Sequence, residues 1–145
     1  MKTLLSSFAI AAVTASPSFA GGHTSGDAAA GESAFGQCQA CHVVRDADGN
    51  VLAGRGRSAP NLYGTGGGAA AVDPDFRYSK SLAEAGEKGL EWTEENFVAY
   101  VMDPTGFLRE YLGDSGARAK MAFRVRSEED ALNLYAYIAS LSPAE

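Results

Sequence analysis

The chain has 145 residues, of which 46% are hydrophobic, and its formal net charge at pH 7 is −6. A chain of this length can bury one modest core, so we expect a single domain. The excess of acidic residues argues against nucleic acid and anionic membrane surfaces as partners.

The N-terminus has the features of a secretory signal peptide. Met1-Lys2 is a short basic start, Leu4–Val13 is mostly apolar, and Ser18-Phe19-Ala20 contains small residues. We therefore predict cleavage after Ala20 and export to a bacterial periplasm. The apolar stretch is too short and too interrupted for a membrane span, and an uncleaved anchor is the alternative.

Cleavage would leave residues 21–145, which the sequence divides into a flexible N-terminal segment (21–26) and one domain (27–145). Loss of Lys2 makes the net charge of this mature chain −7. His23 lies in the flexible segment, where we expect it to be solvated rather than to bind a metal.

Helix start signals occur along the whole domain. Asp27, Thr93 and Ser127 each precede a helical pattern and are residue types that cap helix N-termini. No segment shows convincing strand alternation, and the glycine-rich stretch Val43–Gly68 reads as a loop that can wrap a ligand. We therefore predict an all-α domain. Its helices run from Asp27 towards Cys38, over Ser79–Ala85 (ending at Gly86), from Thr93 to just before Asp103-Pro104, and from Ser127 to Leu141.

The run Cys38-Gln39-Ala40-Cys41-His42 is the attachment motif of c-type haem. Each thiol can form a thioether with one vinyl group of the porphyrin, and the histidine can supply a proximal nitrogen to iron. These are the only two cysteines of the chain, so none is left for a disulfide. The motif predicts one covalently bound haem c.

Other readings of this motif are weaker. A thioredoxin-like redox pair would need a βαβ context, which the sequence lacks. A zinc site would need four ligands, and the adjacent Cys41 and His42 cannot readily occupy two corners of one tetrahedron.

With these residues in place, the chain resembles the class I c-type cytochromes, and most of all the bacterial cytochrome c2 subgroup. The resemblance extends from Asp27 to Leu141 and depends on an ordered set of segments. They are Gly31 and Phe35 before the haem motif, Pro60-Asn61-Leu62-Tyr63-Gly64, Phe76-Arg77-Tyr78, Trp92-Thr93-Glu94-Glu95, Tyr100 before Asp103-Pro104, Phe107-Leu108-Arg109-Glu110, Lys120-Met121-Ala122-Phe123, and Ala136-Tyr137-Ile138-Ala139.

The sixth iron ligand must be chosen between two methionines of the domain. Met102 ends an apolar helix, where a methionine commonly fills the core. Met121 follows the predicted loop Gly113–Ala119, which could carry a thioether to the face of the haem opposite His42. The resemblance also points to Met121, and an iron ligated only by His42 is the alternative. With both axial positions filled, the iron passes electrons but offers no vacancy to a substrate.

The resemblance implies further roles around the haem. Pro60 would accept a hydrogen bond from His42 through its carbonyl, Tyr100 would lie near the Met121 sulfur, Tyr78 and Trp92 would donate to a propionate, and Phe123 would shield the ring edge. Gly31 and Phe35 would meet Tyr137 where the first and last helices cross. For each aromatic residue, ordinary core packing is the alternative.

Two departures from the family pattern stand out. The loop Gly64–Ala71 lacks the arginine that family members usually place near the inner propionate. The attachment region has Gln37 and Gln39 where lysines commonly surround the haem edge, which weakens the case for a strongly acidic partner.

These features together predict a soluble, monomeric periplasmic one-electron carrier of the respiratory or photosynthetic chain, and not an enzyme. By family analogy, a quinol-oxidising complex would be its donor and an oxidase or a reaction centre its acceptor. The alternatives are a haem c electron-entry subunit of a periplasmic dehydrogenase and a haem protein that binds a small ligand at iron.

Overall fold

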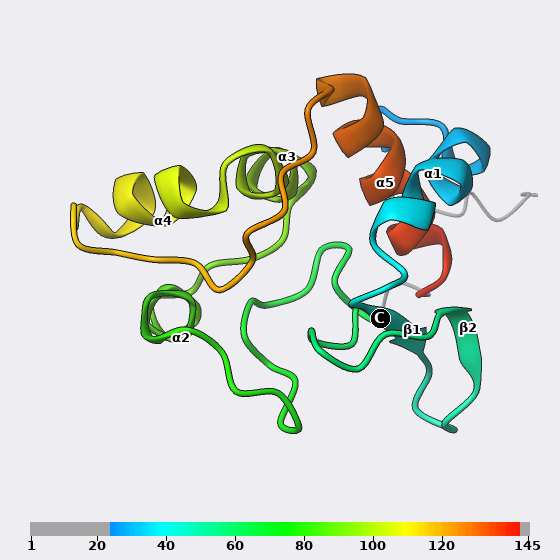
Figure 1. Cartoon of the computed structure of the whole chain (residues 1–145), viewed down its shortest axis with the longest axis horizontal. Coiled ribbons are helices and arrows are strands. Elements are labelled where there is room, and N and C mark those ends of the chain that lie inside the picture. Colours follow the sequence, from blue (N-terminus) through cyan, green and yellow to red (C-terminus); the bar gives the residue numbers. More distant parts are fainter. Residues whose placement is uncertain (1–23, 143–145) are drawn as a thin grey trace, which may run out of the picture.

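The computed structural model describes residues 24–142, so the predicted signal peptide and the first half of the segment 21–26 lie outside the described residues. Figure 1 shows the order of the elements, which are mostly helices with one small sheet. They are α1 (Ala28–Ala34), the 3-10 helix η1 (Phe35–Gln37), β1 (Val43–Arg45), β2 (Val51–Gly54), α2 (Lys80–Glu87), α3 (Glu94–Met102), α4 (Pro104–Leu112) and α5 (Glu128–Ser140).

The predicted helix starts are confirmed by their caps. The Asp27 carboxylate accepts hydrogen bonds from the backbone N–H groups of Ala29 and Ala30, at 2.7 and 3.3 Å. The hydroxyl oxygens of Thr93 and Ser127 accept in the same way at the starts of α3 and α5. These short polar side chains satisfy N–H groups that have no partner within the helix, and so they fix where each helix begins.

Helix α2 extends past the predicted end at Gly86. Gly89 carries the left-handed backbone conformation there, with φ of +87°, which a glycine adopts at no steric cost. Gly86 lies inside the helix. A side chain would not fit there, because a Cβ at this position would lie 2.6 Å from the Ala70 carbonyl oxygen.

Two elements were absent from the sequence prediction. The stretch Val43–Gly68 is not wholly loop, because β1 and β2 pair antiparallel in a short hairpin, with Val44 opposite Ala53. Helix α4 follows α3 directly, with the Asp103 side chain as its cap and Gly113 in the left-handed conformation at its end.

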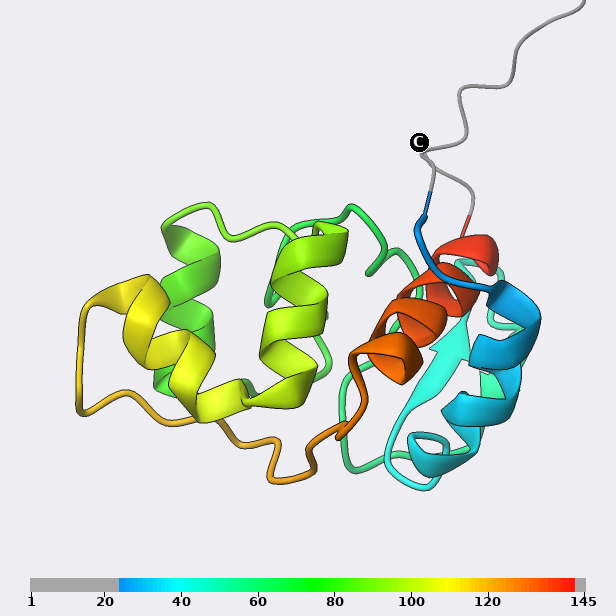
Figure 2. The ribbon, with the colours of Figure 1, turned by 90° about the horizontal axis from the view of Figure 1, so that it is seen from above.

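The elements form two groups on either side of α3. In Figures 1 and 2, α2 and α4 lie at one end of the molecule, and α1, α5 and the hairpin lie at the other. The most deeply buried side chains come from both groups, and among them are Val44, Leu90, Leu108, Leu134 and Ile138.

The crossing of α1 and α5 depends on Gly31. A Cβ on Gly31 would lie 2.0 Å from the Asn133 carbonyl oxygen, so the two backbones touch. One turn further on, the rings of Phe35 and Tyr137 pack with their centroids 5.5 Å apart. The expected meeting of Gly31, Phe35 and Tyr137 is therefore confirmed, and Figure 2 shows the two helices side by side.

We expect Gly31→Ala to lower the free energy of unfolding by about 2–3 kcal/mol, measured by urea denaturation. The new methyl group would overlap backbone, which cannot rotate away, and this loss exceeds the gain of up to about 1 kcal/mol in helix propensity. Gly36→Ala is the control, because nothing lies within 4 Å of a Cβ at that position. Equal effects of the two changes would contradict this account of the crossing.

Candidate haem-binding site

A cavity of about 830 Å³ opens between the two groups of helices. Its size lies within the range of about 300–1,000 Å³ that is usual for ligand and cofactor sites. All nine residues that the sequence analysis placed around a haem line this cavity. They are Cys38, Cys41, His42, Pro60, Tyr78, Trp92, Tyr100, Met121 and Phe123. Met102, the competing methionine, is absent from its walls.

The two thiols lie on one wall, after η1. The N–H groups of Cys41 and His42 both donate to the Cys38 carbonyl, at 3.1 and 2.9 Å, so the motif forms a single tight turn. Both cysteines are free thiols. Burial, followed by the neighbouring Cys41, raises the pKa of Cys38 to about 11, so this thiol is protonated at neutral pH.

Gly56, two residues after β2, packs against the turn of the attachment motif. Its N–H donates to the His42 carbonyl at 3.0 Å. A Cβ on Gly56 would lie 2.0 Å from the Cys41 carbonyl carbon, so only glycine fits against the attachment motif here.

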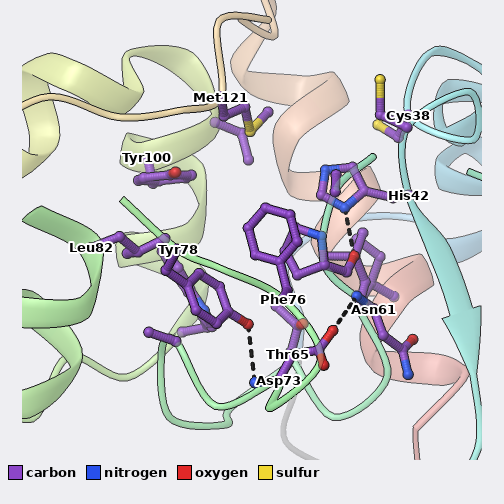
Figure 3. A pocket seen from close by; sticks show the side chains of 18 of the residues that line it. Cys38, His42, Asn61, Thr65, Asp73, Phe76, Tyr78, Leu82, Tyr100 and Met121 are labelled. Carbon is purple, nitrogen blue, oxygen red and sulfur yellow. Dashed lines mark hydrogen bonds between the residues drawn. The ribbon is translucent and has the colours of Figure 1, made fainter. Parts of the chain in front are cut away.

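His42 is held by one hydrogen bond on the side of its ring that faces Pro60. Its Nδ1 lies 2.9 Å from the Pro60 carbonyl oxygen (Figure 3). A carbonyl only accepts, so Nδ1 carries the proton and donates, and Nε2 keeps a free lone pair. Burial lowers the pKa of His42, partly opposed by this hydrogen bond, which favours the neutral ring. A neutral imidazole oriented through its other nitrogen is the form that binds a metal.

Met121 and Tyr100 reach the cavity from other parts of the chain. Met121 lies on the segment between α4 and α5, and Tyr100 lies on α3 (Figure 3). Burial raises the pKa of Tyr100 to about 12. The Trp92 and Phe107 rings pack edge-on against Tyr100, with centroids 4.9 and 5.9 Å away, and hold its ring in place.

The opposite part of the cavity is more polar. The Asp73 N–H donates to the Tyr78 hydroxyl oxygen at 3.0 Å, which leaves the hydroxyl proton free to donate (Figure 3). The Asp73 carboxylate accepts in turn from the N–H groups of Asn61 and Asp75, at 2.9 and 3.0 Å. The pKa of Tyr78 is raised, chiefly by burial and further by the nearby Asp73 charge.

Lys120 is the one basic side chain other than histidine among the described residues that line the cavity. Its ammonium group donates to the Arg77 carbonyl oxygen and lies 5.5 Å from the centre of the Phe76 ring. The wall contributed by residues 64–71 contains no arginine, as the sequence indicated. Phe123, at the mouth, is 44% exposed.

The structure adds participants that the sequence analysis did not assign. Asp73, Asn61 and Phe76 line the cavity. Asn61 could have been suspected, because it directly follows Pro60 in a segment that the resemblance singled out. Asp73 carried no such indication, because its role depends on backbone N–H groups that fold around its carboxylate.

The donor set suits an iron porphyrin better than a bare metal ion. Within residues 24–142, no three His, Cys, Asp or Glu side chains gather in a way that could hold an ion. Instead, two thiols, a histidine with a free Nε2 and a thioether line one large apolar cavity. In the same part of the chain, none of the helices is both long and apolar enough to cross a bilayer.

Comparisons with known proteins agree with this reading. The chain is 57% identical over 122 residues to cytochrome c2 of Rhodovulum adriaticum, covering 83% of this chain and 97% of that one. It is 50% identical over 132 residues to cytochrome c2 of Cereibacter sphaeroides, covering 90% and 89%. The crystal structure of cytochrome c2 from Rhodobacter sphaeroides superimposes with a TM-score of 0.77 at 50% identity, covering 79% and 95%. No family model matches the sequence.

Proposed function

Since the chain belongs to the cytochrome c2 family of class I c-type cytochromes, we propose that it is a periplasmic one-electron carrier with His42 and Met121 as iron ligands. Members of this family transfer electrons and are not enzymes, and they carry one covalently attached haem c. The cytochrome c fold expected from the sequence is confirmed by the superposition, and it is mostly helical with one small sheet.

One observation supports the ligand assignment: two candidate ligands that lie far apart in the sequence line the same cavity. His42, oriented by Pro60, and Met121, from a segment almost 80 residues later, reach the same space, whereas Met102 does not. Cys38 and Cys41 would hold the porphyrin through thioethers. The bound group supplies the electron chemistry, and His/Met ligation favours a high reduction potential.

The other residues of the cavity tune this chemistry. The Pro60 carbonyl keeps His42 in one tautomer. The hydroxyl of Tyr100, whose side chain lines the same cavity as Met121, would donate to the Met121 sulfur, a weak acceptor. Tyr78 and Trp92 would donate to the propionates. Because the described lining offers Lys120 but no arginine, propionate charge would be little compensated, which favours the oxidised form.

Carbon monoxide tests the carrier proposal against its rival, a protein that binds a small ligand at iron. With both axial positions filled, the reduced protein should bind carbon monoxide poorly while it exchanges electrons rapidly with a small redox mediator. Rapid and complete carbon monoxide binding by the wild-type protein would favour an open iron site. Size-exclusion chromatography of native extracts separates a free carrier from a dehydrogenase subunit, which would elute in a larger complex.

The predicted signal peptide Met1–Ala20 supports export, and members of the family are periplasmic. Donor and acceptor stay at the level of class: a quinol-oxidising complex would reduce the protein, and an oxidase or reaction centre would oxidise it. N-terminal sequencing of the mature protein from a periplasmic extract should begin at Gly21.

We expect electron transfer to the native acceptor to depend weakly on salt. Phe123, Ala122, Gln37 and Cys41 line the mouth and are uncharged, with Lys120 as the exposed cation. Salt screens charges over about 10 Å at 0.1 M, so few charges leave little attraction to lose. The second-order rate should fall by less than about tenfold between low and physiological salt, the smallest gain usual for steered association.

Stopped-flow kinetics across a salt series measures this dependence. A steeper loss of rate would show that exposed arginines beyond the lining, such as Arg55, Arg57 and Arg77, join Lys120 in one basic docking face.

A further inference from the structure

The segment that carries Met121 has no regular structure of its own. No helix or strand lies between the end of α4 at Leu112 and the start of α5 at Glu128. Figures 1 and 2 show this segment running past α4 and α3 as one extended connection. Holding a loop residue in one place costs conformational entropy, so the position of Met121 depends on contacts with neighbouring elements.

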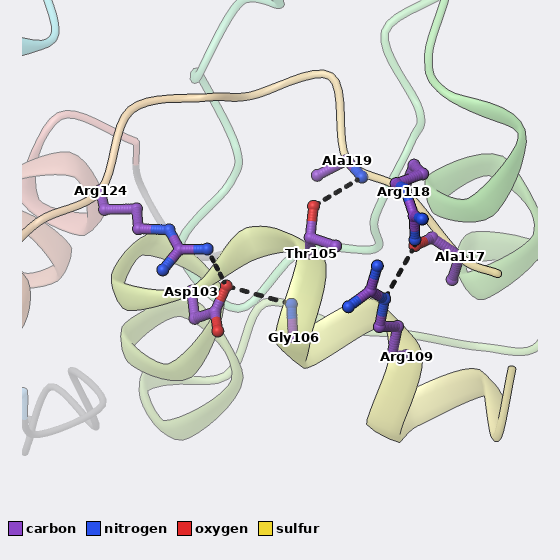
Figure 4. A network of polar contacts seen from close by, with 8 residues as sticks. All are labelled: Asp103, Thr105, Gly106, Arg109, Ala117, Arg118, Ala119 and Arg124. Atoms are coloured by element: carbon purple, nitrogen blue, oxygen red, sulfur yellow. Dashed lines mark hydrogen bonds and ion pairs between the residues drawn. The ribbon is translucent and has the colours of Figure 1, made fainter. Parts of the chain in front are cut away.

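Those contacts lie on both sides of Met121. After it, the Val125 N–H donates to the Val101 carbonyl at 2.8 Å. Before it, the Ala119 N–H donates to the Thr105 hydroxyl oxygen at 3.2 Å. Further back, the Arg109 side chain donates to the Ala117 carbonyl at 3.3 Å, and the Arg124 side chain pairs with Asp103 at 2.9 Å (Figure 4).

Among these contacts, the one made by Thr105 is the best suited to control the methionine. It acts two residues before Met121, and it is partly buried. The ion pair of Arg124 with Asp103 is more than half exposed on both sides, so water and salt weaken it. The bond between Val125 and Val101 joins two backbones and cannot be tuned by a side chain.

Thr105 is also anchored on a rigid support. It is the second residue of α4, next to Pro104, which is almost fully buried. The Asp103 carboxylate accepts from the Gly106 N–H at 3.1 Å and fixes this first turn. The Thr105 hydroxyl is therefore free from capping its own helix and is presented to the neighbouring segment (Figure 4).

We propose that Thr105 is a positioning residue for the distal ligand, whose hydroxyl holds the Ala119 backbone and thereby controls how readily Met121 leaves the iron. This inference rests on the proposed ligation by Met121. The start of α4 would then help to set the equilibrium between Met121 bound to iron and Met121 replaced by another ligand.

The size of the effect follows from the loss of one partly buried hydrogen bond. Without the hydroxyl, the Ala119 N–H has no acceptor, and states with the segment detached should be populated about fivefold more, which corresponds to about 1 kcal/mol. An added ligand binds iron only in those detached states. Its apparent dissociation constant is inversely proportional to their population, so it should fall about fivefold.

The test uses the oxidised, haem-loaded protein and imidazole as the added ligand. Thr105→Val keeps the shape of the side chain and removes the hydroxyl, whereas Thr105→Ser keeps the hydroxyl. We expect imidazole to bind Thr105→Val about fivefold more tightly than wild type, and Thr105→Ser to stay within about twofold of wild type. The Ala119 N–H should also exchange with solvent about fivefold faster in Thr105→Val, measured by NMR.

A matched control separates positioning from general loss of stability. Thr93→Val also removes a hydroxyl from the start of a helix, where it accepts from Asn96, and Thr93 does not line the cavity. This variant should unfold at lower urea concentration while imidazole binding stays within about twofold of wild type. Equal tightening of imidazole binding in both variants would overturn the inference, because affinity would then follow global stability.

Failure of the inference can be distinguished from failure of the ligation. A wild-type protein without the far-red sulfur-to-iron charge-transfer band would refute ligation by Met121, and with it the role of Thr105. A wild-type protein with that band, together with a Thr105→Val variant that binds imidazole like wild type, would refute the role of Thr105 alone.

Discussion

Replacing Cys38 and Cys41 together with alanine is expected to make the haem extractable by acid–acetone, whereas the wild-type haem should stay with the polypeptide. Both thiols lie on one turn at the wall of the cavity, where each can form a thioether. Without thioethers, the porphyrin would be held only by axial ligation and packing, and acid protonates the histidine and releases it. The expected change is from complete retention to complete extraction.

The measurement is the absorbance of the organic phase against that of the precipitated protein. Gln39→Ala is the matched control, because Gln39 lies inside the motif but does not line the cavity, and this variant should retain its haem. Free extraction from the wild-type protein would refute covalent attachment and the assignment of the motif.

The starts of the predicted helices could be read from the sequence because their causes are local. Asp27, Thr93 and Ser127 each bond to an N–H two or three residues ahead, so the residue type alone carries the information. The site was predictable for another reason, because the haem motif combined with family resemblance selected nine residues that all line one cavity.

The sequence did not predict helix α4, although the residues at both of its ends are typical of helix ends. Asp103 and Pro104 are favoured residues at a helix start, and Gly113 is favoured after a helix end. The sequence favoured only one role for the Asp103-Pro104 pair, the end of α3, whereas Asp103 also caps the start of α4. Gly106 in the first turn further weakened the helical pattern, since glycine is a poor helix former.

The hairpin and the position of the Met121 segment depend on hydrogen bonds between residues that are separated along the sequence. Strands of three and four residues are too short to show alternation, and they form because the Asp46–Asn50 turn brings them together. The bond between Thr105 and Ala119 spans 14 residues, and that between Ser81 and Arg118 spans 37. No local pattern encodes such pairs, so only the folded chain reveals them.

Met121→Ala is expected to abolish the far-red sulfur-to-iron charge-transfer band of the oxidised protein and to lower the reduction potential. A thioether stabilises reduced iron, so its loss favours the oxidised state. We expect a fall on the order of 0.1 V or more, within the range of about 0.8 V that axial ligands span. Visible spectroscopy and a redox titration measure the two effects, and the variant should also bind carbon monoxide.

Met102→Leu is the control for this change. Met102 is partly buried against the core and does not line the cavity, so a swap that nearly conserves volume should cost less than about 1.5 kcal/mol and leave the band intact. Loss of the band in Met102→Leu with its retention in Met121→Ala would make Met102 the ligand. Because Met102, at the end of α3, does not line the cavity that His42 lines, that result would also require α3 to move so that Met102 reaches the haem iron.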